Sequence, residues 1–339
     1  MTGTLGAWLV FIALSPDVHY ARRPIHLTQV FIMTRYTHIA CAAVLLAAQT
    51  AAAERAARDL QGIWVGGTLT PLERPPDHAD KPLLTQAEMA DQQRLLTEKF
   101  WASGHKMGEV GRDNDAFLDD ELSVLPTGQT SLIVDPPDGH LPLRPEIEAR
   151  RQANLTRFDS YETMSQWDRC ISRGPTELFS VNYNNAYQII QTDTHVVIHS
   201  EMIHEARIIP LQGAHADARV RGWNGDSRGH WEGDTLVVES SNFNGKGWIA
   251  TGRNWGRLYG VPSTEQLRIT ERFTRMDAKT LRYQVTVEDP EIYTAPWTLS
   301  YPLTLDNDYR IYEYACHEGN QAIELILRGA RTQERDAGG

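Results

Sequence analysis

A short segment between residues 199 and 207 concentrates side chains that can transfer protons or hold an anion. It reads His-Ser-Glu-Met-Ile-His-Glu-Ala-Arg. On a straight strand Glu201 shares a face with Arg207, whereas His204 joins that face only if a bulge intervenes. With that bulge, Glu201 could orient His204 as an acid–base group while Arg207 binds an anionic group. The alternative is a solvated strand face with salt bridges.

The same segment permits a metal site, because His199, Glu201 and His204 have the spacing His-x-Glu-x-x-His. A strand would place the two histidines on opposite faces, and the spacing differs from the helical His-Glu-x-x-His pattern of zinc enzymes. We therefore predict no metal, with a metal at these three residues as the minor alternative. The chain carries no nucleotide, flavin or haem motif, so we expect no cofactor.

A second candidate is a carboxylate that interrupts an apolar strand face. Leu267, Ile269 and Phe273 alternate with polar residues, and Glu271 falls on the apolar side. A carboxylate that points into a core is costly unless it is paired or protonated. Glu271 is therefore a candidate general acid or base with a raised pKa in a barrel lumen. The alternatives are a bulge or a buried pair with an arginine.

Glycines, two tryptophans and charged residues are interleaved between residues 223 and 234. This composition predicts closely apposed loops at a barrel mouth, with side chains that bind substrate or only satisfy the loop backbone. The candidate substrate-binding residues are Trp223, Asp226, Arg228 and Trp231. Ser227 lies outside any Gly-x-Ser-x-Gly elbow, which argues against an acyl-enzyme serine. Residues 242–255 form an aromatic, glycine-rich stretch that is a candidate lid.

The last chemical cluster surrounds Cys316. His317 follows it directly and is either a second proton-transfer group or a cap on the next turn. Cys170 is the other cysteine after residue 53. In an oxidising compartment we expect the two cysteines to form a disulfide, which the chain-entropy model values at about 4–5 kcal/mol. Two free buried thiols are the alternative.

The segment that starts at Met33 has the layout of a secretory signal peptide. A basic start precedes an apolar run at 39–48 that is too short to span a bilayer, and small residues follow up to Ala53. We expect translation to start at Met33, residues 1–32 to be upstream sequence, and cleavage to follow Ala53. The product, residues 54–339, would be a single periplasmic or secreted domain.

The formal net charge of −11 argues against nucleic acids and anionic membrane surfaces as partners. No stretch after Ala53 is long and apolar enough for a membrane span. The composition does not indicate an oligomeric state.

The remaining patterns predict a mainly β protein with a helical insertion at about 85–168. Thr85 and Glu88 form a capping-box pattern before a helix at 87–101, and further helices are expected at 145–156 and 160–168. From residue 186 the apolar period is two, which indicates an antiparallel barrel or two packed sheets. After a first strand near Trp64, strands are expected at 186–191, 195–201, 203–209, 234–240, 266–275, 280–288, 297–305, 310–316 and 322–327.

Three blocks resemble a family of secreted bacterial proteins that are mostly uncharacterised. They are Glu-Met-Ile-His-Glu-Ala-Arg-Ile-Ile at 201–209, Gly-Asp-Ser-Arg-Gly-His-Trp-Glu-Gly-Asp-Thr-Leu-Val-Val at 225–238 and Tyr-Glu-Tyr-Ala-Cys-His-Glu-Gly-Asn at 312–320. The resemblance implies one family domain over about 59–328 and brings no assigned activity. Gly-x-Trp at 62–64 is more loosely similar to lipocalin-like barrels, and a fold would not settle the function.

These observations favour a secreted enzyme that performs cofactor-free acid–base chemistry on a small apolar or aromatic molecule. Hydration, elimination, isomerisation and hydrolysis all fit, so a lyase, an isomerase and a hydrolase stay open. The candidate catalytic residues are Glu201, His204, His317 and Glu271. One alternative is a non-catalytic periplasmic carrier of a hydrophobic ligand, which would need an apolar lumen. Another is a structural or envelope-associated protein, which would need no pocket.

Overall fold

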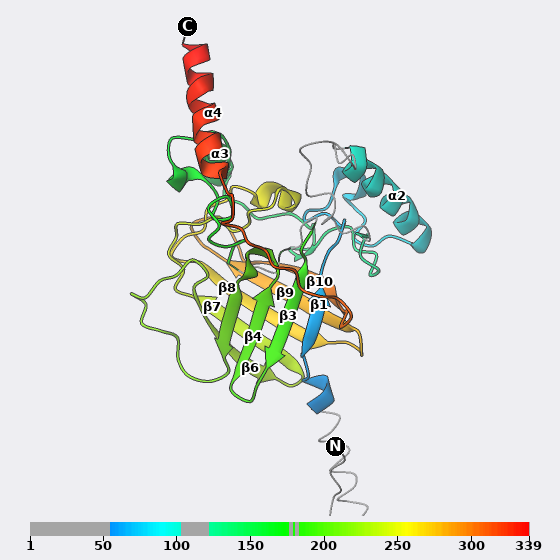
Figure 1. Cartoon of the computed structure of the whole chain (residues 1–339). Helices are drawn as coiled ribbons and strands as arrows, with labels where there is room; N and C mark the ends of the chain where they lie inside the picture. Colours follow the sequence, from blue (N-terminus) through cyan, green and yellow to red (C-terminus); the bar gives the residue numbers. More distant parts are fainter. Residues whose placement is uncertain (1–54, 103–121, 176–178, 180–182, 339) are drawn as a thin grey trace, which may run out of the picture. The chain divides into compact units, whose positions relative to one another are not determined.

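Nine antiparallel strands follow one another around a nearly closed barrel in the computed structural model (Figure 1). The structure describes residues 55–102, 122–175, 179 and 183–338, without the side chains of 100–102 and 253–255, and these residues belong to the unit Glu54–Gly339. The order around the barrel is β5-β4-β3-β1-β10-β9-β8-β7-β6, and β2 pairs with β10 outside this path. The strands are β1 Gly62–Val65, β2 Ile133–Asp135, β3 Ala186–Gln191, β4 His195–Ser200, β5 Ala206–Pro210, β6 Asp226–Glu232, β7 Thr235–Ser241, β8 Arg268–Arg275, β9 Thr280–Glu288 and β10 Trp297–Leu305.

Two glycines allow close approaches between strands. Gly229 in β6 faces β5, where a Cβ atom would come within 3.1 Å of the Ile209 side chain and 3.0 Å of Leu211. A larger residue would push apart β5 and β6, the two strands at the ends of the strand order. Gly62 in β1 has a positive φ of 137°, and a Cβ there would lie 2.5 Å from the Leu305 side chain. Both positions therefore favour glycine.

Large apolar side chains fill the barrel. The alternation predicted for 281–287 is confirmed, because Leu281, Tyr283, Val285 and Val287 are all fully buried. Most of the buried apolar residues belong to one continuous cluster. Its largest fully buried members are Trp64, Trp297, Tyr187, Tyr283, Tyr301, Phe243 and Phe273. These packed side chains occupy the interior of the barrel.

The helices partly follow the prediction. Besides a helical stretch at 55–57, the α-helices among the described residues are α2 Gln86–Ala102, α3 Pro145–Thr156 and α4 Ala322–Ala337. The capping box before α2 is confirmed, since Glu88 accepts a 2.8 Å hydrogen bond from the Thr85 backbone and its own N–H lies 3.4 Å from Thr85 Oγ1. Of the helix expected at 160–168, only the turn Tyr161–Thr163 is helical. Across the described residues, no helix is long and apolar enough to cross a membrane.

The mainly β antiparallel fold class is confirmed, but several elements were predicted wrongly. The expected strand at 322–327 is the start of α4, and 310–316 is an irregular segment. Residues 306–321, which join β10 to α4, are called the strap below. The block at 226–232, expected as loops, is strand β6, whose small inward residues Ser227 and Gly229 fit the crowded seam beside β5. The region of the signal peptide lies outside the described residues.

Candidate functional site

The inward-facing carboxylate predicted at Glu271 is present, and it is paired. Glu271 is fully buried in β8, with Arg207 Nη2 donating to it at 2.6 Å and the Tyr283 hydroxyl at 2.7 Å. Burial and the neighbouring Glu271 charge raise the pKa of Tyr283 well above its usual value, so its hydroxyl keeps its proton and donates. The structure thus shows the buried arginine pair that the sequence left as an alternative. It gives Arg207 this internal partner in place of the expected anionic ligand.

The expected bulge between Glu201 and His204 is instead a tight reversal. Strand β4 ends at Ser200, a helical turn covers Met202–His204, and β5 starts at Ala206. Ile203 and His204 both adopt positive φ, of 62° and 44°, which is unusual for residues other than glycine. The prediction that Glu201 and Arg207 share a strand face is therefore wrong, since the chain turns back between them. His199 pairs with Ala206 across this hairpin.

Glu201 and His204 each bind the strap rather than one another. The fully buried Glu201 carboxylate accepts from the Tyr309 hydroxyl at 3.0 Å and the Tyr312 backbone N–H at 2.9 Å, and also from Asn184. The exposed His204 donates a hydrogen bond from Nδ1 to the Tyr314 carbonyl oxygen at 2.7 Å. The β4–β5 turn thus holds the strap against the end of the barrel.

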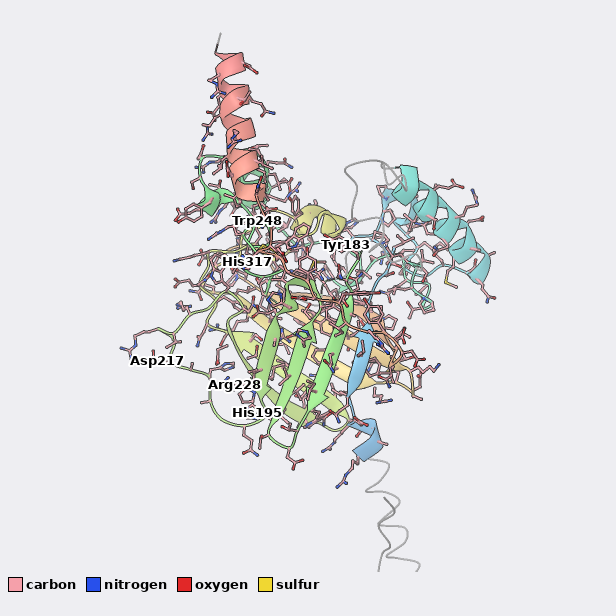
Figure 2. All side chains as sticks on the ribbon, in the orientation of Figure 1. Tyr183, His195, Asp217, Arg228, Trp248 and His317 are labelled. Carbon is pink, nitrogen blue, oxygen red and sulfur yellow. A yellow bond between two sulfur atoms is a disulfide. The ribbon has the colours of Figure 1, made fainter. Side chains whose placement is uncertain are left out.

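A disulfide anchors the strap farther along. Cys170 is bonded to Cys316, and their Cα atoms lie 5.6 Å apart. Asn320 donates to the Asp168 carbonyl oxygen at 3.4 Å, on the same side. His317 is exposed and lies at this end of the barrel together with Tyr183 and Trp248 (Figure 2). Among the residues described, no group of three or more His, Cys, Asp or Glu side chains is arranged to hold a metal ion.

The four substrate-binding candidates of the 223–234 block do not converge. The Asp226 carboxylate accepts hydrogen bonds from Arg228 at 2.7 Å, from His215 Nδ1 at 2.8 Å and from the Ala216 backbone N–H at 2.9 Å. Burial alone would raise the pKa of Asp226, but these three contacts hold it below its usual value. Arg228 also donates to the Ala214 carbonyl oxygen at 2.8 Å. Asp226 and Arg228 thus form hydrogen bonds with the backbone of the loop before β6. This is the role that the sequence left open as the alternative to substrate binding.

The two tryptophans of that block stack with arginines in separate places. The Arg169 guanidinium lies 5.1 Å from the Trp223 ring centre, and Arg58 lies 5.7 Å from that of Trp231. Trp231 also packs against the barrel core. In the candidate lid, Trp248 lines a cavity, and the side chain of Trp255 lies outside the described residues.

Two cavities that share Asp168 form the best candidate site, called the cleft here. The strap lobe, of about 480 Å³, lies between the strap and the residues Trp167, Tyr183 and Asn184. The apolar lobe has about 550 Å³. Its lining contains Asn154, Thr163 and Asp168 besides the apolar and aromatic residues Leu155, Phe158, Met164, Trp248, Tyr259 and Ile326. Cavities of this size and composition suit small organic ligands.

The walls of the apolar lobe are fixed by polar contacts behind them. The buried side chain of Gln166 accepts from the Trp248 backbone N–H at 2.9 Å and donates to the Trp248 carbonyl oxygen at 2.6 Å. The Trp248 ring meets Tyr259 edge to face, with ring centres 5.4 Å apart. Arg331 of α4 donates to the Phe158 carbonyl oxygen at 3.0 Å. The 242–255 stretch, a candidate lid in the sequence, thus contributes Trp248 as a wall that is tied in place.

Asp168 is the residue that lines both lobes. Its Oδ2 accepts a 2.7 Å hydrogen bond from the Ser165 hydroxyl, and its backbone N–H donates to Ser165 Oγ at 3.2 Å. This local turn holds the carboxylate in position. No salt bridge involves Asp168 among the residues that the structure describes. The carboxylate can therefore serve a ligand as a hydrogen-bond acceptor, a counter-charge or a base.

Asp168 was missed because the predictions concentrated on titratable groups within single strands. The expected disulfide carried the signal that could have found it. A bond between Cys170 and Cys316 must bring residues 167–168 next to residues 312–318, which are the walls of the strap lobe.

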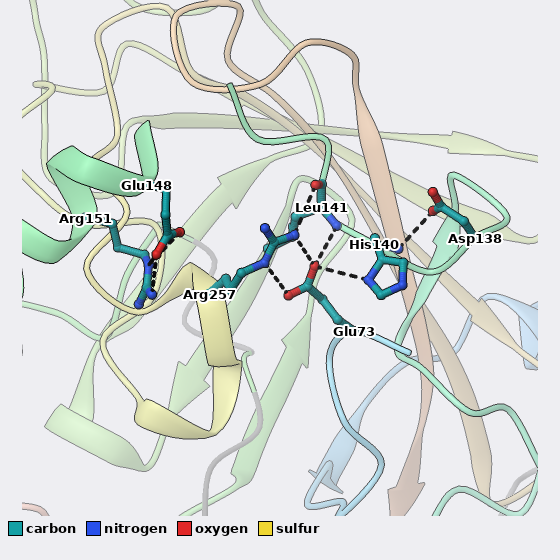
Figure 3. A network of polar contacts seen from close by, with 7 residues as sticks. All are labelled: Glu73, Asp138, His140, Leu141, Glu148, Arg151 and Arg257. Carbon is teal, nitrogen blue, oxygen red and sulfur yellow. Dashed lines mark hydrogen bonds and ion pairs between the residues drawn. The ribbon is translucent and has the colours of Figure 1, made fainter. Parts of the chain in front are cut away.

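A charged network anchors the turn that precedes Tyr259 (Figure 3). Arg257 donates to both oxygens of Glu73, at 2.8 and 2.6 Å, and the Leu141 backbone N–H donates at 2.9 Å. His140 Nδ1 lies 3.6 Å from the same carboxylate. Burial alone would raise the pKa of Glu73, but Arg257, Leu141 and His140 together hold it below its usual value of 4.5.

Acid should weaken this network. Because the pKa of Glu73 is lower in the folded than in the unfolded protein, its contribution to stability is complete above the unfolded value and is lost as the pH falls through the folded value. Urea midpoints measured between about pH 3 and 6 should fall less steeply on acidification in Glu73→Gln than in the wild type. The exposed Glu288→Gln should keep the wild-type slope, and equal slopes in all three proteins would contradict the prediction.

Comparisons with family models, curated proteins and solved structures found no match. The resemblance to a secreted bacterial family therefore stays an expectation from its three blocks, and the functional argument rests on the geometry of the cleft.

Proposed function

We propose that the protein binds a small molecule with an aromatic or apolar body in the cleft. The observation that carries this proposal is the apolar lobe, where Phe158, Trp248 and Tyr259 surround a cavity of about 550 Å³. The strap lobe beside it offers polar groups for the other end of the ligand. A few polar groups beside an apolar cavity are typical of ligand sites. The packed barrel gives less support to a carrier with a ligand inside the lumen.

Acid–base catalysis on the bound molecule is a second candidate function. The position of Asp168 favours it, because a carboxylate that is held by Ser165 and lines both lobes can accept a proton from a ligand in either one. In this proposal Glu201 and His204 are positioning residues that hold the strap. His317 is then a surface residue beside the disulfide. Asp168 replaces the four residues that the sequence favoured as the catalytic group.

Tryptophan fluorescence tests the binding proposal. Trp167 and Trp248 line the cleft, so their emission should change when a neutral aromatic probe such as phenethyl alcohol is added. The change should largely disappear in a Trp167→Phe/Trp248→Phe variant and persist in Trp231→Phe, whose tryptophan lies outside the cleft lining. Simple sugars should produce no change. A response to sugars alone, or one that survives the double substitution, would refute binding of aromatic molecules in the cleft.

We also propose that the chain is exported and cut after Ala53. The disulfide supports an oxidising compartment, where such bonds persist. The layout from Met33 to Ala53 supports cleavage. Intact-mass analysis of the protein purified from the periplasm should give a chain that starts at Glu54. An N-terminus upstream of Met33 would contradict this prediction.

A further inference from the structure

We propose that the ligand of the cleft carries a positive charge, so that its class is an aromatic amine or a related organic cation. This inference rests on the proposed function, since it concerns the polar end of a molecule whose aromatic body occupies the apolar lobe. The charges of the cleft lining and the aromatic rings of the strap lobe carry it.

The charged side chains that line the cleft are all acidic. Asp168 lines both lobes, and Glu313 and Glu318 line the strap lobe. No lysine, arginine or histidine occurs among the described residues that line either cavity. A carboxylate or phosphate ligand would enter without a counter-charge, whereas a cation would gain attraction from groups already in place.

Aromatic rings accompany these carboxylates. Four aromatic residues line the strap lobe, and they are Trp167, Tyr183, Tyr312 and Tyr314. The electron-rich face of such a ring attracts an ammonium group within about 6 Å, most strongly for tryptophan. Rings together with carboxylates are a combination that recognises an organic cation, whereas the carboxylates would repel an anion.

The arginine nearest to Asp168 in the sequence already contacts two aromatic rings. Arg169 follows Asp168 directly, but its guanidinium lies 5.3 Å from the ring centre of Tyr161 and 5.1 Å from that of Trp223. These rings hold the Arg169 charge outside the cleft lining. The Asp168 carboxylate, held by Ser165, is thus left as the fixed negative charge that lines both lobes.

Calorimetric titration with three probes of similar size tests the charge of the ligand. The probes are phenethylamine, phenethyl alcohol and phenylacetate, which carry positive, zero and negative charge. At low salt we expect the amine to bind at least about tenfold more tightly than the alcohol, and phenylacetate most weakly. Added sodium chloride should reduce the advantage of the amine and leave the alcohol unchanged.

Variants assign this preference to the cleft. Asp168→Asn keeps an acceptor for Ser165 and should weaken phenethylamine about tenfold, a larger loss than for phenethyl alcohol, which has no charge to lose. Glu313→Gln/Glu318→Gln changes two exposed strap residues, so it should fold normally and weaken the amine by a smaller factor. Asp193→Asn, an exposed carboxylate in the β3–β4 turn at the other end of the barrel, is the matched control and should bind all probes as the wild type does.

The outcomes separate this inference from the proposed function. Equal binding of the amine and the alcohol, or tighter binding of phenylacetate, would overturn the positive charge and leave aromatic binding intact. An amine preference that survives both Asp168→Asn and Glu313→Gln/Glu318→Gln would also overturn the inference. Failure of all three probes to bind would refute both proposals.

Discussion

Replacing Cys170 and Cys316 together by serine should lower the free energy of unfolding by about 4–5 kcal/mol. The bond joins residues 146 positions apart, so its loss releases a long loop of the unfolded chain. Urea unfolding of the wild type and the double variant, both without reductant, measures the difference. The unfolded, unreduced wild type should show no reactive thiol. Two titratable thiols, or equal stability of the two proteins, would contradict the prediction.

The same variant should also lose ligand binding, because the strap forms one wall of the cleft. Without the disulfide, the strap would depend on noncovalent contacts, namely those of Glu201 and His204 and the hydrogen bond from Asn320 to the Asp168 carbonyl oxygen. These weaker contacts would hold the wall of the cleft less firmly. Glu201→Gln provides a comparison that weakens one anchor and keeps the covalent bond. It should lose less stability and retain probe binding better than the cysteine variant.

Replacing Glu271 by glutamine should destabilise the protein by about 3–5 kcal/mol. The substitution keeps the shape of the side chain but removes the negative charge that pairs with Arg207, a residue only 8% exposed. Denaturant titration at neutral pH measures the effect. Arg207→Met/Glu271→Leu removes both charges together, so it should recover much of the lost stability.

A neighbouring pair supplies the matched control for Glu271. Arg272 follows Glu271 in β8 and forms a 2.7 Å salt bridge with Glu232 of β6. Both of these side chains are exposed. Glu232→Gln should therefore cost less than about 1 kcal/mol. A stable Glu271→Gln protein would show that the buried pair is unimportant for folding, and the inward carboxylate would again be a candidate for catalysis.

The sequence predicted what depends on neighbouring residues. A period of two specifies which side of a pleated strand is buried, so the inward positions of β9 and the inward Glu271 were correct. The capping box of α2 was also correct, because a few adjacent residues define it. The disulfide was predicted from the number of cysteines and the expected compartment.

Short apolar runs did not distinguish a strand from a helix. Ile323, Leu325 and Leu327 alternate like a strand, but Ile323, Ile326, Leu327 and Ala330 also follow the helical period, and α4 is what forms. A run this short fits both periods, so its neighbours in space decide between them. The 223–234 block was predicted as loops because it is rich in glycine, but its Gly229 lies in β6, where it allows the close approach of β5. Strand β5 is separated from β6 by a long loop, so the sequence around Gly229 does not reveal this contact.

The partners of the polar residues depended on the tertiary structure. The alternation placed Glu271 inside the barrel, but only the order of the strands brought Arg207 of β5 to it. Likewise, the residue types at Glu201 and His204 suggested catalysis, whereas the β4–β5 turn directs both to the strap. The cleft arises where the strap, α4 and the segments around Asp168 and Trp248 meet. Sequence periodicity describes the faces of single elements. A site built from segments that are far apart in the chain exists only after closure of the barrel and the disulfide have set their distances.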